Sequence, residues 1–366
     1  MSEAMLAPKK RLVMATKEMV EAQKSCASAF TPRAETDTTQ AAKVWHEDDN
    51  FGGQATKALV MVLKTRGCDW LIKSGCTMCG YFNDSFFDDV SADHIILQFE
   101  NAMREHQGED LIKIYTSGSF FDEREVPAAA YTQILKRVGE TTGRLSVESQ
   151  PQIMTDAQVA EAMTHLKEFE VGIGMESAHD DVLAHSVNKA FRFRQFVAGA
   201  ELIHRHGARA KTYLVQKAPF LTEREAIEDT TTSILKVAPH SDVVSVNPIN
   251  VQRHTLVADL YKHGAFRPPW LWSVAKVVLD ASRELPDGVT LKCHPVGGGH
   301  ARGAHNCGKC DKRAMKALED YTLGRGTIRL ERLFETPECG CYSRWQWELD
   351  NEGLLGAACW TDPVVW

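Results

Sequence analysis

Residues 57–80 read Lys57-Ala-Leu-Val-Met-Val-Leu-Lys-Thr-Arg-Gly-Cys68-Asp-Trp-Leu-Ile-Lys-Ser-Gly-Cys76-Thr-Met-Cys79-Gly80. The first part is a short apolar run between lysines, which is typical of a buried β-strand. The second part is a loop with three cysteines, and its glycines let the backbone wrap tightly. The stretch therefore predicts a strand that delivers three thiol groups at its carboxyl end.

Working outward from this strand, further short apolar runs alternate with helical patterns. The expected strands are 58–63, 111–115, 144–147, 169–173, 210–215, 242–246 and 289–291. Ser91, Thr155 and Thr222 are good first residues for helices, and Thr222 has Glu225 three residues later, as in a capping box. Repeated strand–helix alternation predicts parallel strands with right-handed crossovers. We therefore expect an α/β fold, a partial (β/α) barrel whose ligands bind at the carboxyl ends of the strands.

The rest of the chain divides by composition. Residues 1–50 form a polar arm with little core of its own, residues 51–292 contain the barrel, and residues 293–366 form a small module rich in Gly, His and Cys. The longest apolar run, 58–63, is too short to span a bilayer, and no secretory signal stands at the N-terminus. These features predict a cytoplasmic protein without a membrane segment.

Charge and cysteine content further limit the class of protein to which the chain can belong. The chain has 42 Lys and Arg against 49 Asp and Glu, a net charge of −7. An acidic chain of this size does not hold a long nucleic acid by bulk charge, so it would need a local basic patch or a basic partner. Ten cysteines in a cytoplasmic protein are more often metal ligands or catalytic groups than disulfides.

The first cysteine cluster is Cys68, Cys76 and Cys79. Three thiolates in one loop suit a [4Fe–4S] cluster with one iron left open, and S-adenosylmethionine could chelate that iron through its amino and carboxylate groups. A structural zinc loop completed by Cys26 or a histidine is the alternative. The spacing fits both almost equally. The position after the first expected barrel strand favours the iron–sulfur cluster.

These residues resemble the radical S-adenosylmethionine superfamily. Seven residues separate Cys68 from Cys76 and two separate Cys76 from Cys79, and the long first gap resembles the elongator-like branch. Within this branch the chain is similar to the radical subunit of archaeosine synthase, the RaSEA family, over about residues 55–345. The matching stretches are TRGCDWLIKSGCTMCGY, IYTSGSFFDEREVP, VESQPQIM, VGIGMES, NPINVQRHTLVADLYKHGAFRPPWLWS and PVGGGHARGAHNCGKCD.

The resemblance implies a radical enzyme of tRNA modification. A reduced [4Fe–4S] cluster would cleave S-adenosylmethionine, and the resulting radical would act on a lysine adduct of a 7-deazaguanine base. Cleavage of a carbon–nitrogen bond, as by a lyase, would leave the amidine of archaeosine. The implied partners are tRNA, the lysine-transferring archaeosine synthase subunit, and an electron donor such as ferredoxin or flavodoxin.

Other candidate residues follow the expected strands. Ser117, Gly118 and Ser119 match the superfamily loop that holds the methionyl amine, although this chain departs from the common Gly-Gly-Glu form. Glu148 and Glu176 stand at the ends of two expected strands, and each is followed by Ser. Their carboxylates could accept hydrogen bonds from ribose hydroxyls or an ammonium group, although acidic residues at strand ends are commonly solvated at the rim. Asn247 and Asn250 are candidates for base contacts.

The segment Lys189-Ala-Phe-Arg192-Phe-Arg194-Gln-Phe alternates basic and aromatic residues. Aromatic faces stack on bases and basic groups pair with phosphates, so it is the candidate tRNA patch. An amphipathic helix start with a solvated charged side is the alternative, and the pattern slightly favours it.

The second cysteine cluster is Cys307-Gly-Lys-Cys310 with Cys339-Gly-Cys341. Two such pairs can give four thiolates to one tetrahedral ion, which is typical of structural zinc. An auxiliary iron–sulfur cluster, or Cys293 or His305 as a substitute ligand, are the alternatives. Two other functions stay open from sequence: a different radical modification of tRNA, such as methylthiolation or acylation, and a non-enzymatic adaptor stabilised by zinc.

Overall fold

A computed structural model of the chain describes residues 16–29 and 37–355. Its strands form one sheet in the order β1-β2-β3-β4-β5-β6-β7-β8, with β1 antiparallel to β2 and all later neighbours parallel. The strands are β1 Lys43–Phe51, β2 Gln54–Val62, β3 Leu111–Tyr115, β4 Arg144–Glu148, β5 Glu168–Glu176, β6 Arg209–Gln216, β7 Val243–Pro248 and β8 Thr290–Cys293. The expected partial β/α barrel is therefore confirmed, with all seven predicted strands as β2 to β8.

Strand β1 is the element that the sequence did not predict. It lies in what we expected to be a polar arm, because Lys43-Val-Trp-His-Glu-Asp-Asp-Asn-Phe51 shows no clear apolar alternation. Its acidic end nevertheless faces inward: Asp49 is only 2% exposed. The missed signal is Gly52-Gly53, where both residues have positive φ, as a two-residue hairpin turn requires.

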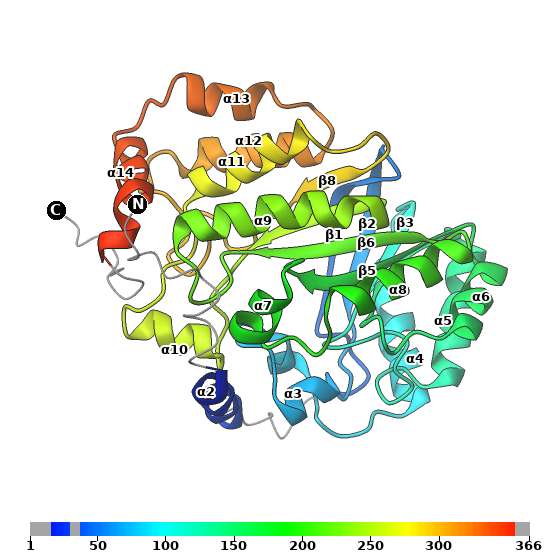
Figure 1. Cartoon of the computed structure of the whole chain (residues 1–366). Helices are drawn as coiled ribbons and strands as arrows, with labels where there is room; N and C mark the ends of the chain where they lie inside the picture. The colour runs from blue at the N-terminus through cyan, green and yellow to red at the C-terminus, as the bar shows by residue number, and fades with distance from the viewer. Residues whose placement is uncertain (1–15, 30–36, 356–366) are drawn as a thin grey trace.

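Most of the helices cover the outer face of the sheet. In Figure 1, α4, α5, α6 and α8 lie toward one end of the sheet, and α9, α11 and α12 lie toward the other. The larger helices are α2 Thr16–Ser28, α4 Ala92–Met103, α5 Ala128–Thr141, α6 Asp156–His165, α8 Phe193–Arg205, α9 Glu223–Val237, α10 Leu256–Lys262, α11 Leu271–Ser282, α12 Asp311–Thr322, α13 Ile328–Glu335 and α14 Cys341–Leu355. The short elements are α3 Asp69–Lys73, η1 Tyr81–Asp84, α7 Asp180–Val182, η2 Leu183–Val187 and η3 Ala238–His240.

The helix starts follow the predicted capping chemistry. The Ser91 hydroxyl accepts from the backbone N–H of His94 at the start of α4. Thr155 and Thr222 open α6 and α9 with complete capping boxes. Each helix then packs apolar side chains against the outward side chains of the strands, and the main core forms there, for example from Ile112, Leu145 and Phe99.

The C-terminal residues belong to the same core. Leu318, Leu330 and Trp345 are buried in one apolar cluster with the strands of the barrel. The ring of Tyr342 lies 5.2 Å from that of Trp272 on α11, centroid to centroid. The segment after residue 292, which we expected to be a separate module, therefore packs continuously on the barrel.

The curved sheet also brings its two ends together. Lys292 on β8 forms an ion pair of 2.8 Å with Asp49 on β1, although β1 and β8 are not hydrogen-bonded neighbours. A buried ion pair thus links the first and last strands across the inside of the barrel. The open end of the barrel lies at the carboxyl ends of β2 to β8, where the cysteine loop begins.

Candidate functional site

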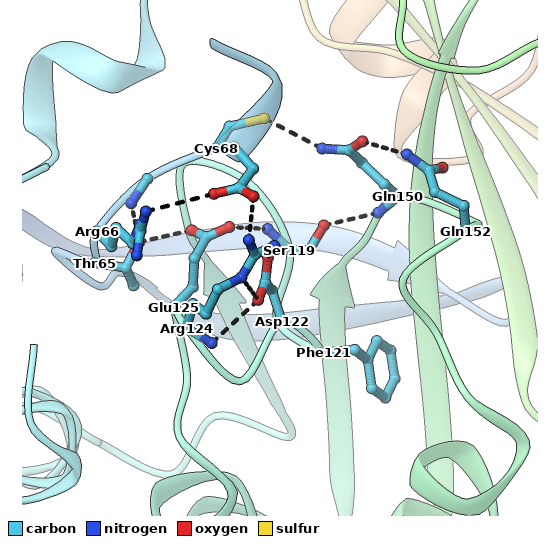
Figure 2. Close-up of polar contacts among 12 residues, drawn as sticks. Thr65, Arg66, Cys68, Ser119, Phe121, Asp122, Arg124, Glu125, Gln150 and Gln152 are labelled. Atoms are coloured by element: carbon cyan, nitrogen blue, oxygen red, sulfur yellow. Dashed lines mark hydrogen bonds and ion pairs between the residues drawn. The ribbon is translucent and has the colours of Figure 1, made fainter. Parts of the chain in front are cut away.

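The cysteine loop leaves the carboxyl end of β2 and turns back across the barrel opening. Gly67 and Gly75 have φ values of +92° and +83°, which side-chain-bearing residues rarely adopt. Cys68 is the residue before α3, and the Gln150 amide lies with its Nε2 3.2 Å from the Cys68 sulfur (Figure 2). The loop therefore presents the Cys68 sulfur to a side chain that follows β4.

The three thiols are close to one another but are not arranged around a single ion. Burial raises the pKa of Cys68 and of Cys76, and raises that of Cys79 to about 11, and the neighbouring thiols add to the effect for Cys76 and Cys79. Within residues 16–29 and 37–355, these three sulfurs do not form a group whose ligand atoms all lie within 4.8 Å of one another. A bound cation would favour the thiolates.

The segment after β5 clamps the cysteine loop. Thr77 donates its hydroxyl to the carbonyl of Ser186 at 2.7 Å and its N–H to the carbonyl of Val187 at 3.0 Å. Asn188 donates to the Gly75 carbonyl at 2.7 Å, and its own carbonyl accepts from the Trp70 indole at 2.8 Å. Two segments more than 100 residues apart therefore fix each other's shape.

Lys189 lies in this clamp and not on a nucleic-acid-binding surface. Its ammonium forms an ion pair with Glu176 at 2.8 Å, and its side chain is 12% exposed. Burial alone would lower the pKa of Lys189, but Glu176 and the thiols of Cys76 and Cys79 raise it above its ordinary value. Arg192 donates to the carbonyls of Lys189 and Phe191, and only Arg194 of the predicted basic patch is exposed. The prediction that Lys189 belongs to an exposed basic patch is therefore wrong.

The loop after β3 packs directly beneath the cysteine loop. The Ser117 hydroxyl donates to the carbonyl of Tyr81 at 3.1 Å, and the Ser119 hydroxyl accepts from the N–H of Gln150 at 3.0 Å. A Cβ on Gly118 would overlap the Glu125 carboxylate and approach the Cys68 Cα to 2.9 Å. Gly118 is therefore needed for the two loops to meet.

Glu125 holds these loops together, and the sequence did not single it out. Its carboxylate accepts from the Thr65 hydroxyl and from the N–H of Ser119, each at 2.7 Å (Figure 2). Burial raises the pKa of Glu125 to about 7. Residues 122–125 contain three acidic residues, and only the tertiary packing shows which of them turns inward.

Polar side chains stand at the carboxyl ends of β3 to β7, close to the cysteine loop. They are half-buried: Tyr115, Glu148, Glu176, Tyr213 and Asn247 on the strands, and His294 just after β8. Burial raises the pKa of Glu148, although a hydrogen bond with Tyr213 opposes this effect. Glu176 has a φ of +70°, which turns its carboxylate toward Lys189. Asn250 instead lies beside Gly297 in the loop after β8.

The second cysteine cluster forms a compact group of four sulfurs. The Sγ atoms of Cys307 and Cys339 are 3.4 Å apart, those of Cys310 and Cys341 are 3.5 Å apart, and all four lie within 4.8 Å of one another. Four thiolates around one zinc ion stand about 3.8 Å apart, given bonds of about 2.3 Å. The hydrogen bond from the Cys341 thiol is the main cause that lowers the pKa of Cys310 to about 5.

The alternative ligands lie outside this group. Cys293 is a buried residue of β8, and its backbone N–H and C=O both bond to the Thr322 hydroxyl. His305 has its Nδ1 2.8 Å from the carbonyl of Gly303. Neither belongs to the four-sulfur group, so the geometry favours the two cysteine pairs alone.

Comparison with known proteins relates most of the chain to one family, although no family model matches it. The chain is 37% identical to the archaeosine synthase subunit beta of Methanosarcina acetivorans over 321 residues, and this alignment covers 86% of this chain and 91% of that protein. It is 34% identical over 320 residues to the subunit of the same name from Thermococcus kodakarensis, covering 85% and 97%. The chain belongs to the archaeosine synthase subunit beta family. The family resemblance that we identified from residues 55–345 is thereby confirmed.

Solved structures are more distant. An archaeal Elp3 of Methanocaldococcus infernus has a TM-score of 0.48 and 15% identity, covering 72% of this chain and 63% of that one, and this likeness carries no functional argument. In this member of the archaeosine synthase subunit beta family, no helix within the described residues is long and apolar enough to cross a membrane.

Proposed function

We propose that the chain is a radical S-adenosylmethionine enzyme of archaeosine formation in tRNA, and that Cys68, Cys76 and Cys79 hold its [4Fe–4S] cluster. The observation that carries this proposal is the set of three cysteines in one loop after β2, where Lys189 and Glu176 lie close enough to act on the thiols of Cys76 and Cys79. The family to which the chain belongs supports it. When bound, the cluster and S-adenosylmethionine would supply a 5′-deoxyadenosyl radical.

The chain's own residues have separate roles in this proposal. The loop Ser117-Gly118-Ser119, held by Glu125, would place backbone groups against S-adenosylmethionine where it meets the cysteine loop. Glu148 and Glu176 would accept hydrogen bonds from its ammonium or ribose hydroxyls, and Asn247 would contact its base. The half-buried positions of these side chains, at the carboxyl ends of β4, β5 and β7, support this assignment.

The reaction and its partners follow from the family. We propose that the chain acts on a lysine adduct of a 7-deazaguanine base in tRNA and breaks a carbon–nitrogen bond. The name "subunit beta" of the relatives supports a partner subunit, for which we propose the lysine-transferring archaeosine synthase subunit. A low-potential donor such as ferredoxin or flavodoxin would reduce the cluster. The protein would work in the cytoplasm.

The second cluster would hold structural zinc. The four sulfurs of Cys307, Cys310, Cys339 and Cys341 are too close together for a cubane, whose thiolates bind different irons. The indole of Trp272 donates to the Cys341 sulfur at 3.3 Å, and the Asn306 amide donates to the Cys310 sulfur at 3.3 Å. Such donors stabilise thiolates at a closed metal site.

Metal analysis with a cleavage assay tests the proposal. Anaerobically purified protein should contain four irons, matching sulfide and one zinc, and should form 5′-deoxyadenosine from S-adenosylmethionine when reduced. Replacing Cys68, Cys76 and Cys79 together with Ala should remove the iron and the product but keep the zinc. Cys26→Ala is the matched control, because Cys26 lies on α2 outside both clusters and should change neither metal. Cleavage by the triple variant would contradict the assignment.

A second assay tests the substrate. The wild-type chain with its partner subunit and lysine-bearing tRNA should release archaeosine, detected by mass spectrometry of digested nucleosides. Formation of a methylthio or acyl nucleoside instead would replace this function with another radical modification.

A further inference from the structure

Positive charge is exposed on one part of the rim of the barrel, which is the set of loops at the carboxyl ends of β2 to β8. The loops that follow β7 and β8, residues 249–255 and 294–310, contain no Asp or Glu, although the whole chain has a net charge of −7. Arg253 and Arg302 are exposed in these two loops. Within residues 16–29 and 37–355, no carboxylate is paired with either guanidinium. This part of the rim is therefore locally cationic in an acidic protein.

Other loops of the rim carry the opposite charge. Residues 84–89, which follow the cysteine loop, contain three aspartates and no basic residue, and residues 116–127, which follow β3, contain three acidic residues and one arginine. Like charge repels a polyanion from these loops. Lys309 is basic and exposed in the loop after β8, but it lies between Cys307 and Cys310, whose thiolates would balance its charge. The charge distribution therefore directs an anion to the part of the rim that carries the two arginines.

Arg302 is fixed in position by its neighbours. Its backbone carbonyl accepts from the N–H of Val251 at 2.8 Å, and its Nε donates to the carbonyl of Val251 at 3.0 Å, so that the loops after β7 and β8 are joined. Its guanidinium carbon lies 5.8 Å from the centre of the Tyr261 ring. Among the described residues, the terminal N–H groups of Arg302 have no hydrogen-bond acceptor. A guanidinium held in this way is preorganised to bind a phosphate through two parallel N–H bonds.

The loop after β7 is also bonded to the end of the cysteine loop, beside Tyr81 and Arg253. The Gly80 N–H donates to the side-chain oxygen of Gln252 at 2.5 Å, and the Asn83 amide donates to the backbone carbonyl of Arg253 at 3.2 Å. The guanidinium of Arg253 makes no hydrogen bond to another described residue. The two arginines therefore belong to loops that are tied to the segment carrying the third cysteine.

Tyr81 is an exposed aromatic residue beside the proposed active site. Its exposed fraction is 64%, although exposed large aromatic side chains are uncommon without a binding role. Its hydroxyl lies beside Gln252 and close enough to Glu148 and Glu176 for their carboxylates to act on it. The residue therefore extends from the site to the outer surface, where a nucleic-acid base could stack on its ring.

We propose that Tyr81, Arg253 and Arg302 form the surface on which the tRNA substrate docks, with the arginines on phosphates and the Tyr81 ring stacked on a base. This inference rests on the proposed function for the identity of the nucleic acid. A tRNA is too large to enter the barrel, so its modified base must approach the cysteine loop across the rim. Phosphate contacts position a nucleic acid, and the acidic loops of the rim exclude them elsewhere. Two arginine contacts are few, which agrees with weak binding by an acidic chain.

The test is equilibrium binding of tRNA that carries the lysyl adduct, measured anaerobically without reductant at several salt concentrations. Loss of one phosphate contact weakens binding and reduces the slope of log K against log salt by about one. Arg253→Gln and Arg302→Gln should each reduce the slope by this amount, and the double variant by about two. Arg104→Gln is the matched control, because Arg104 is exposed at the end of α4, before β3 begins, at the other end of the barrel. It should change neither affinity nor slope.

Substitution of Tyr81 should have a different signature, because stacking on a base is not an ionic contact. Tyr81→Leu should weaken tRNA binding about 5- to 100-fold with the salt slope unchanged. Tyr81→Phe keeps the ring and should bind tRNA within about twofold of wild type. If Tyr81→Leu instead keeps its affinity for tRNA and loses S-adenosylmethionine, the ring belongs to the cofactor site and its place on the tRNA surface is overturned.

The outcomes separate this surface from the proposed function. Unchanged salt slopes in both arginine variants overturn the surface even if the wild-type chain and its partner form archaeosine. Reduced slopes without archaeosine formation support the surface and overturn the proposed reaction. Arginine variants that lose affinity for the partner subunit but not for tRNA would make the surface a protein interface and overturn the proposal. If Arg302→Gln does not fold, as judged by zinc content and circular dichroism, Arg253→Gln decides, because the Arg253 side chain bonds to no other described residue.

Discussion

Asp229 gives a quantitative test of how the site is supported. It lies on α9, is 8% exposed, and accepts a 2.6 Å hydrogen bond from the hydroxyl of Ser177, the residue after Glu176. Burial raises the pKa of Asp229 from 3.8 to about 7, partly offset by the Ser177 hydrogen bond. The folded protein therefore keeps the proton at pH values where the unfolded chain has lost it. The free energy of unfolding should fall as the pH rises from about 4 to about 7 and change little above that.

Replacing Asp229 with Asn removes this titration. Between pH 5 and pH 8 the unfolded chain has already lost the Asp229 proton, while the folded protein loses it only near pH 7. About two pKa units of the shift therefore affect stability, and the free energy of unfolding of the Asn variant relative to wild type should rise by about 3 kcal/mol over this range. A chain of this size has an unfolding entropy of about 0.8 kcal/mol per kelvin. The difference in free energy therefore corresponds to a rise of about 4 °C in the Tm of the variant relative to wild type. The measurement is the Tm of variant minus wild type at pH 5, 6, 7 and 8.

The control is Asp280→Asn, because Asp280 is paired with Lys276 on the surface of α11. Its effect on Tm should be small and the same at every pH. A Tm difference for Asp229→Asn that does not grow with pH would refute the reasoning, since a buried acid with an ordinary pKa has no titration in this range.

Three further results are expected. Gly118→Ala should force Glu125 away from Ser119 and weaken S-adenosylmethionine binding at least tenfold, measured by equilibrium binding, while Gly207→Ala at an uncrowded surface turn should not. Cys310→Ser should lower bound zinc from one per chain toward zero and lower Tm by several degrees with iron content retained, because metal binding is coupled to folding. With a net charge of −7, the chain alone should bind tRNA weakly and with a steep salt dependence, and the partner subunit should strengthen binding; tight binding by the chain alone at physiological salt would contradict this.

Local sequence determined much of the architecture. The barrel strands turn apolar residues such as Ile112 and Leu145 toward the helices, and these residues are visible in the sequence without any tertiary information. Thr155 and Thr222 mark helix starts through bonds to residues three positions away. The two cysteine clusters were visible for the same reason, because the ligands of each come in closely spaced groups. Strand β1 was missed because its inward residue, Asp49, is charged and owes its burial to lysines on β3 and β8.

Only the tertiary structure decided the roles of isolated charged residues. Lys189 looks like part of a basic patch in the sequence, but the clamp between residues 183–189 and the cysteine loop turns it inward to Glu176. Glu125 stands among other charged residues, and nothing in the local sequence distinguishes it. Whether a charged side chain belongs to the site or is merely solvated depends on which groups the fold places beside it and on how far the fold excludes water from it. Those neighbouring groups come from distant strands.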